Sequence, residues 1–268
     1  LNVSAEYFKK NGIDLIGDND VAPSFGITRI RGNFAETLTK GVDVVIGRDW
    51  LSGSLRWKTD LFYSRVKDRV VQVGITQTVG NLINSYGGGV IPVEGNPLFS
   101  VYTFAWAGLN PDNGNPRGFL NGEPSENYSS IIGTATPESL QFHGPSRPTD
   151  FGALRNTFSY KGINLSVNVS YRFGYYYKRQ SIDYFSLQRG IIGHGDYELR
   201  WRQPGDERIT QIPSLPSTAN NPRHLFYSNS AVLVEKGDHF RLQDIRLGYT
   251  LTRTNLPWFP FTSAEVYG

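Results

Sequence analysis

The sequence predicts an all-β fold: an antiparallel segment of a transmembrane β-barrel, with about eight or nine strands and long extracellular loops. Three observations carry this prediction. Apolar and polar residues alternate over long stretches, no segment shows a convincing period of 3.6 residues, and the connections are either very short or very long. Alternation with a period of two gives a strand one apolar face and one polar face.

The longest alternation runs from Ile163 to Tyr177. A strand of this length reaches roughly 50 Å at ~3.3 Å per residue. Even at a tilt of about 45° it would cross a hydrocarbon core of about 30 Å. Its apolar face therefore suits lipid, and burial in a protein core is the alternative. The odd positions are all apolar or aromatic: Ile163, Leu165, Val167, Val169, Tyr171, Phe173, Tyr175 and Tyr177.

Shorter alternations predict further strands on both sides of this stretch. Near the C-terminus, Phe240 and Leu242 have the opposite parity from Ile245, so a β-bulge is expected near Gln243–Asp244. A last strand is expected over Phe261–Tyr267. The apolar members of the other alternations are Val3, Ala5 and Tyr7; Val42, Val44 and Ile46; Leu55, Trp57, Leu61 and Tyr63; Leu154, Phe158 and Tyr160; and Ile245, Leu247, Tyr249 and Leu251.

The connections between these strands fall into two classes. Residues 51–54 and 161–162 are tight turns, whereas 74–97, 110–151 and 178–233 are long and rich in turn-forming residues. Outer-membrane barrels have short turns on one side and long loops on the other, a combination that compact soluble β domains rarely show.

Aromatic residues gather where the strands are expected to end, at the positions of the interfacial aromatic girdles of membrane barrels. They are Tyr63, Tyr160, Tyr175, Tyr176, Tyr177, Trp258 and Phe259.

Strand direction provides an internal check on this scheme. If both tight turns lie on the periplasmic side, the stretches beginning at Leu98 and at Gly152 would both run inward. Two strands that run in the same direction cannot be antiparallel neighbours. Either a spanning strand lies within 110–151, near Ser139–His143, or Leu98–Leu109 does not span. We expect the former.

Composition excludes several other classes of protein. The 268-residue chain has no cysteine, which excludes disulfides and cysteine-based metal sites. It has no apolar run of about 18 residues, so no transmembrane helix is expected. The net charge of +3 is spread through a mixture of both signs, so the sequence does not indicate a nucleic-acid-binding surface.

Several long, ordered motifs resemble the C-terminal third of the SusC/RagA family, the TonB-dependent outer-membrane transporters of Bacteroidota. The resemblance begins near "EYFKKNGIDLIG" at Glu6 and extends over almost the whole chain. The other motifs are "GLNPDNGNPRGFLNG" from Gly108, "FHGPSRPTDFGALRNTFSYKGINLSVNVSYRFGYYYKR" from Phe142, "DYELRWRQPGDERITQIPS" from Asp196 and "FYSNSAVLVEKGDHFRLQDIRLGY" from Phe226.

This resemblance implies a fold and a function beyond what the alternation predicts. The family fold is a 22-stranded barrel filled by an N-terminal plug. A SusD-like surface lipoprotein closes the mouth, and the TonB complex acts on the plug to release an oligosaccharide or peptide inward. On this basis residues 1–268 are the C-terminal portion of the barrel, without the plug or the N-terminal half, in the outer membrane of a Gram-negative cell and in contact with its lipid.

The polar faces of two neighbouring strands are the first candidate site. Their side chains are expected to face the lumen, where they either line the transport path or merely hydrate the wall and hold the plug. The candidate residues are Arg155, Thr157, Asn164, Asn168 and Arg172.

The segment "RWRQPGDE" in the longest loop is the second candidate site. Tryptophan stacks on sugars and arginine binds carboxylates, so these residues could contact the lid or the substrate. The alternative is a loop that packs on itself around a Pro-Gly turn. The candidate residues are Arg200, Trp201, Arg202, Asp206 and Glu207.

We expect no enzyme, no metal site and no cofactor. "NPDNGN" at Asn110–Asn115 offers several oxygen atoms, but it lacks the spacing of a calcium loop and reads as a turn. The four histidines have no metalloprotease spacing, and no acid pair stands out. The alternative function is a soluble, secreted β-sandwich that binds carbohydrate, which would bury Leu165 and Val169 against a second sheet.

Overall fold

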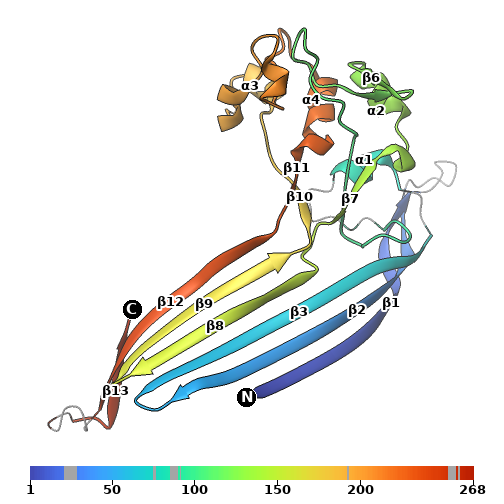
Figure 1. Cartoon of the computed structure of the whole chain (residues 1–268). Coiled ribbons are helices and arrows are strands. Elements are labelled where there is room, and N and C mark those ends of the chain that lie inside the picture. Colours follow the sequence, from blue (N-terminus) through green and yellow to red (C-terminus); the bar gives the residue numbers. More distant parts are fainter. Residues whose placement is uncertain are drawn as a thin grey trace.

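The computed structural model describes residues 1–20, 29–74, 77–84, 90, 92–191, 193–252, 258 and 260–268. A seven-stranded antiparallel sheet dominates it, with strand order β1-β2-β3-β8-β9-β12-β13 (Figure 1). No helix in this described part is long and apolar enough to cross a membrane. The seven strands are β1 (Asn2–Asp20), β2 (Arg29–Ser52), β3 (Leu55–Val73), β8 (Asp150–Tyr160), β9 (Ile163–Phe173), β12 (His239–Thr252) and β13 (Ser263–Tyr267).

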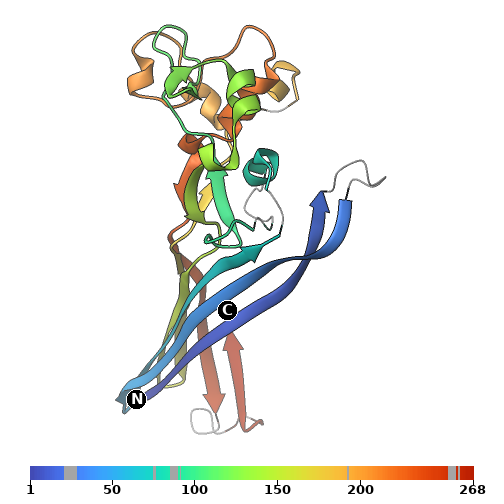
Figure 2. The same ribbon diagram turned by 90° about the vertical axis from the view of Figure 1, so that its right-hand side faces the viewer.

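Two long insertions, between β3 and β8 and between β9 and β12, fold together at the end of the sheet away from the tight turns (Figures 1 and 2). We call this part, residues 77–149 and 174–238, the cap. Its elements are α1 (Val79–Asn84), β4 (Ser100–Thr103), β5 (Gly118–Leu120), β6 (Glu123–Ser125), α2 (Tyr128–Thr134), a 3₁₀ turn (Pro137–Ser139), β7 (Gln141–Pro145), β10 (Tyr176–Lys178), α3 (Tyr184–Gln188), 3₁₀ turns (Gly195–Leu199 and Asp206–Arg208), α4 (Asn221–Ser228), a 3₁₀ turn (Ala231–Leu233) and β11 (Val234–Lys236).

The cap helices are too short for a helical period to be visible in the sequence. They have five to eight residues, and side chains define where three of them begin. Asn127 accepts a hydrogen bond from the Ser130 amide (3.1 Å), Asp183 from the Ser186 amide (2.9 Å), and Asn220 from the Arg223 amide (2.9 Å). These N-caps satisfy amides that have no partner within the helix.

The β8–β9 hairpin has the geometry that its sequence predicts. Its two-residue turn, Lys161-Gly162, has φ of +46° and +88°, the left-handed pair that matches the twist of adjoining strands. The turn fixes the register, so Leu154 lies opposite Val169 and Phe158 opposite Leu165. The expected bulge in β12 is confirmed, because its register against β9 shifts between Leu242 and Asp244.

The prediction of an additional spanning strand within 110–151 is wrong. β3 pairs directly with β8, so the direction of the strands is consistent without one. The stretch Leu98–Leu109 does not span. Its strand β4 has four residues, all buried, and pairs with β7 inside the cap. A spanning strand needs about nine to eleven residues.

The alternation from Ile163 to Tyr177 does not form one continuous strand. β9 ends at Phe173, and Gly174 follows with φ of +76°. The Gly174 amide donates to the Asp238 carboxylate (2.7 Å), and Tyr176–Lys178 then form β10 in the cap. The longest strands lie elsewhere, with 19, 24 and 19 residues in β1, β2 and β3.

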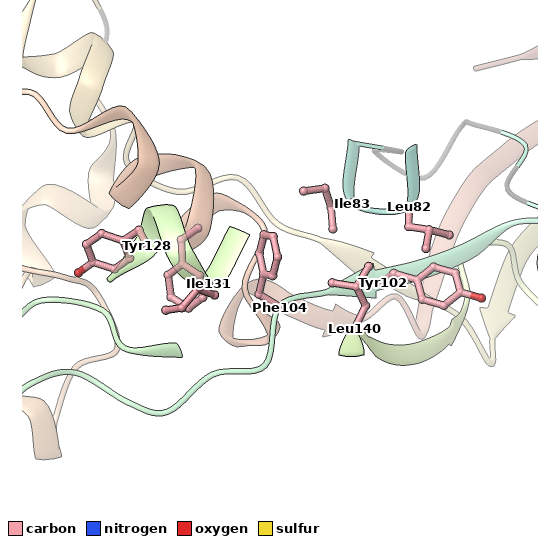
Figure 3. Packing of buried hydrophobic residues seen from close by; sticks show 8 residues of the cluster. Leu82, Ile83, Tyr102, Phe104, Tyr128, Ile131 and Leu140 are labelled. Atoms are coloured by element: carbon pink, nitrogen blue, oxygen red, sulfur yellow. The ribbon is translucent and has the colours of Figure 1, made fainter. Parts of the chain in front are cut away.

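The hydrophobic core lies in the cap rather than on the sheet. Among the described residues, nearly all buried apolar side chains come from the two insertions, and only Ala35 and Val70 come from the long strands. One cluster joins both insertions, since Phe226 of α4 packs with Phe104 and Tyr128 (Figure 3). The cap therefore has its own core, whereas no described residue of the chain covers the apolar side of the sheet.

Candidate functional site

One face of the sheet is apolar and exposed on every strand. Phe240 is 71% exposed, Val3 60% and Ile245 57%, values that a second packed sheet would not allow. An uncovered apolar surface of this extent is typical of the lipid-contacting surface of a transmembrane barrel. Register places one row of opposed residues across six strands: Val3, Ile46, Leu61, Leu154, Val169 and Leu242.

Aromatic rings mark the turn end of this apolar face. Trp57 stacks on Trp50 at 5.5 Å and on Phe158 at 5.6 Å between ring centroids. The indole nitrogens are also satisfied, because Trp50 donates to the Thr59 hydroxyl (3.1 Å) and Trp57 to the Asn156 amide oxygen (3.0 Å). Rings with a satisfied polar tip suit a membrane interface.

The expected aromatic positions are confirmed only in part. Tyr160 ends β8 and lies on the apolar face opposite Ile163, as expected. Tyr63 lies on the same face opposite Val44, but in the middle of β3 rather than at its end. The prediction that Tyr175, Tyr176 and Tyr177 belong to a girdle is wrong, because these residues follow β9 and pack in the cap. Their contacts are Tyr175 with Gly237, Tyr176 with Gly144, and Tyr177 with Glu235. Trp258 is 76% exposed in the final turn, and Phe259 lies outside the described residues.

The five residues expected to face the lumen share the opposite, polar face of β8 and β9. Arg155 lies opposite Asn168, and Arg172 opposite Phe151. Thr157 and Asn164 are in the same alternating set, since they face Ser166 and Ser159. Register thus gives all five side chains one common side, although it does not test their role in transport.

Hydrogen bonds connect these polar side chains across the strands. The Ser159 hydroxyl donates to the Asn164 amide oxygen (2.7 Å), and the Asn164 amide nitrogen donates to the Thr250 hydroxyl (3.0 Å). The Asn168 amide donates to the Asp244 carboxylate (3.0 Å). Such a ladder stabilises a hydrated wall and holds its side chains in fixed positions.

Charged residues on other strands extend this polar face, and the sequence analysis did not single them out. Lys58 pairs with Asp60 at 2.9 Å, and the Ser64 hydroxyl donates to Asp43 (2.6 Å). Asp60 lies opposite Arg155 in the register. The signal was available in the alternation, because these residues occupy the positions between the apolar ones. The face therefore carries charges of both signs.

In the cap, the segment "RWRQPGDE" packs largely on itself. Trp201 is only 7% exposed and donates to Glu207 (3.3 Å), while the Asp206 carboxylate accepts from the Arg202 amide (2.9 Å). The Arg200 guanidinium stacks over the Tyr197 ring at 3.8 Å. Of the five candidates Arg202 is well exposed, so it is best placed for an external contact, and the role of the set stays a prediction.

The oxygen-rich stretch "NPDNGN" binds a carboxylate of the chain itself. The side-chain amides of Asn110, Asn113 and Asn115 all donate to Glu126. The described residues contain no group of three or more acidic, histidine or cysteine side chains placed to hold a metal. The motif therefore builds a structural network in the cap.

Arg223 of α4 fastens this network to the rest of the cap, and no sequence signal identified it. It is 3% exposed, and its guanidinium donates to the Asn115 side chain (3.0 Å) and the Ser214 carbonyl (2.7 Å). Burial lowers the pKa of Arg223, and the nearby Tyr128 and Tyr184 oppose this shift. Arg223 thus connects α4 with the segments around Asn115 and Ser214, which lie far apart in the chain.

A cavity of about 230 Å³ lies between the segment 179–183 and α4, with His194 and Leu233 also in its lining. Beside it, Arg179 forms an ion pair with Asp196 at 2.7 Å. Burial opposes ionisation of Asp196, but the Arg179 and Ser181 hydrogen bonds outweigh it and lower the carboxyl pKa. Burial lowers the pKa of His224, against the opposing charge of Asp183. Burial therefore favours the neutral form of this histidine.

Comparison with known proteins shows what this arrangement is similar to. No family profile matches the chain. TonB-dependent receptor P26 of Formosa agariphila is 22% identical over 277 residues, covering 97% of this chain and 27% of the receptor. TonB-dependent receptor P39 of the same organism is 25% identical over 302 residues, covering 96% of this chain and 28% of the receptor.

Solved structures show the same fold. The RagAB peptide transporter superposes with a TM-score of 0.70 at 16% identity, covering 99% of this chain and 28% of that one. The RagAB peptide importer in the open-open state superposes with a TM-score of 0.71 at 18% identity, covering 99% of this chain and 28% of that one. The chain thus spans little more than a quarter of the length of these proteins. Its motifs, its relatives and its fold agree on one resemblance: it is similar to part of the β-barrel of the SusC/RagA-type TonB-dependent transporters of the outer membrane.

Proposed function

We propose that this chain forms part of the wall and the extracellular cap of a transporter that takes up a nutrient across the outer membrane. The observation that supports this most directly is the sheet, which has an exposed apolar face and a polar, hydrogen-bonded face. A wall between lipid and a hydrated path needs both. The remainder of the barrel, with the plug, would come from the rest of the protein.

TonB would supply the energy for uptake through that plug. A SusD-like lipoprotein would close over the cap, as the resemblance implies. The exposed Arg202, which pairs with Glu198 at 3.0 Å, offers one contact for the lipoprotein or for the cargo.

The cargo that we propose is an oligosaccharide or a peptide. The polar face carries hydroxyl, amide and charged groups of both signs, which suit either class. The titles of the RagAB structures name a peptide transporter and importer, which favours testing peptides beside glycans.

The alternative of a soluble carbohydrate-binding sandwich lacks support from the described residues. It requires a second sheet over the apolar face, and Leu242 and Leu247 on that face are 55% and 56% exposed.

An uptake assay in cells that carry the full-length protein tests the proposal. Fluorescent oligosaccharides and peptides would be supplied with and without an active TonB complex, and Arg155→Glu would be compared with Lys161→Glu in the periplasmic turn. We expect TonB-dependent uptake that Arg155→Glu reduces and the turn variant does not. Uptake that is equal without TonB, or no uptake of either cargo class, would contradict the proposal.

A further inference from the structure

Three lysines form a row across the outer face of the sheet. Lys9 of β1 lies opposite Lys40 of β2, and Lys40 lies opposite Lys67 of β3, so all three side chains project from the same side. All three are exposed. Like charges directly opposite one another destabilise a sheet unless something neutralises them.

This row continues the lipid-contacting face toward the cap. Two residues before Lys9, Tyr7 lies opposite Val42, and two further back Ala5 lies opposite Val44. Because β1 runs from the turn end toward the cap end (Figure 1), the lysines lie on the extracellular side of these apolar residues. Lysine side chains at such a border place their ammonium groups among lipid headgroups.

Within the described residues, Asp150 acts electrostatically on Lys67, but no carboxylate contacts the row directly. Among the residues that the structure describes, no carboxylate forms an ion pair with Lys9, Lys40 or Lys67, whereas Lys58 on the polar face pairs with Asp60 at 2.9 Å. Asp68 is adjacent in sequence to Lys67, but it projects to the other face and accepts from the Leu98 amide (2.8 Å). Asp150 also pairs with Arg65 at 3.7 Å, so the row keeps an excess of positive charge that a ligand from outside can neutralise.

A cavity of about 490 Å³ is lined by two lysines of the row, Lys40 and Lys67. Its charged lining residues are Lys40, Lys67, Arg65, Arg69 and Asp68, so positive charge predominates. Tyr7 and Val42 supply apolar walls next to the lipid-contacting surface. Arg65 also forms an ion pair with Asp150, with 3.7 Å between Nε and Oδ1. A ligand that fits must carry negative charge at one end and an apolar body at the other.

We infer that this lysine row binds the phosphate groups of a phosphorylated glycolipid in the outer leaflet. The ammonium groups would neutralise the phosphates, and the acyl chains would continue along Tyr7 and Val42 onto the apolar face. A free phosphate would match only the charge, whereas the lipid matches the charge, the apolar wall and the position. This inference is independent of the cargo, because the site lies on the side of the sheet away from the lumen.

Lipid titration of the purified full-length transporter, followed by native mass spectrometry, tests the inference. The probes are bisphosphorylated lipid A, the same lipid without phosphates, and inorganic pyrophosphate. We expect lipid A to bind about tenfold or more tightly than its dephosphorylated form. The variant Lys9→Gln/Lys40→Gln/Lys67→Gln should lose that difference.

Two further variants separate charge from structure. Lys9→Arg/Lys40→Arg/Lys67→Arg keeps the charge and should retain binding. Lys10→Gln/Lys161→Gln/Lys236→Gln removes three exposed lysines that are not in the row and should bind like the parent protein. Only variants that show the folded, heat-modifiable form on gels are compared.

Three outcomes would overturn the inference. They are unchanged binding in the glutamine variant of the row, equal binding of the dephosphorylated lipid, and competition by pyrophosphate at the same concentration as lipid A. The last would assign the row to free phosphate. Loss of nutrient uptake is not among these outcomes, so failure of the proposed transport function is scored separately.

Discussion

Gly114 makes room for Trp201 in the cap. Its φ is +69°, and an added Cβ would lie 2.3 Å from the indole ring. Gly114→Ala should therefore combine backbone strain with a clash, and should destabilise the cap by about 2 kcal/mol or more. Limited proteolysis of the full-length protein would detect this as faster cleavage within the cap.

Gly122→Ala is the matched control for that variant. Gly122 also has a positive φ (+85°), but a Cβ there would meet nothing within 4 Å. Gly122→Ala therefore introduces backbone strain without a clash, which costs about 1 kcal/mol. Equal cleavage rates for the two alanine variants would show that the contact with Trp201 contributes nothing.

Acid should loosen the part of the cap around α4. Burial lowers the pKa of His224, so its stabilising neutral form is fully present above the unfolded value of about 6.5 and is lost as pH falls below it. The carboxyl pKa values of Asp183 and Asp196 are also lowered, because hydrogen bonds outweigh burial, and their contribution is lost at still lower pH. All three shifts have the same sign.

Hydrogen exchange measured at several pH values would check this. We expect less protection in α4 at pH 5 than at pH 7.5, after correction for intrinsic exchange rates. His224→Asn should remove much of the difference between these two conditions, since the carboxylates stay ionised at both. Protection that is independent of pH would contradict the role of His224.

At the scale of the element, the two faces of β9 are expected to contact different surroundings, lipid on one side and water on the other. Val169 lies on the apolar face between Leu154 and Leu242, whereas the adjacent Asn168 lies on the polar face and donates to Asp244. A lysine on the lipid side near the midplane costs about 2–4 kcal/mol. Val169→Lys should therefore reduce the folded fraction of the full-length protein in membranes, and Asn168→Lys should be tolerated.

Heat-modifiability on gels measures that folded fraction. The pair is well matched because the two positions are neighbours in one strand and receive the same side chain. If both variants folded equally well, the assignment of the two faces to lipid and water would be wrong.

At the scale of the whole molecule, the cap and the sheet are held together by different forces. The cap has a buried core around Phe226, which is fully buried and packs on Phe104 and Tyr128. The sheet is held by backbone pairing, and its two faces are exposed, one apolar and one polar. Phe226→Ala should cost the cap about 3–5 kcal/mol and leave the sheet intact.

Hydrogen exchange resolved by peptide would separate the two parts in the full-length protein. Peptides from β4, α2 and α4 should lose protection, while those from β8 and β9 keep it. An equal loss in both would mean that cap and wall unfold as a single cooperative unit.

The sequence by itself determined which side of each long strand is apolar. Because side chains alternate along any strand, Leu165 and Asn164 had to face opposite ways, and the parity change at Gln243–Asp244 had to produce a bulge. The common face of Arg155, Thr157, Asn164, Asn168 and Arg172 follows from the same local rule, and so does the tight turn at Lys161-Gly162.

Only the tertiary structure decided which alternating stretches span the membrane and which fold into the cap. The four residues of β4 pair with β7 and are all buried in the cap, which their own sequence does not reveal. The sequence predicts Trp201 as a contact residue in a loop, whereas in the structure its ring packs against Gly114. The physical reason is that alternation is a property of neighbouring residues, whereas burial and pairing join segments that lie far apart along the chain.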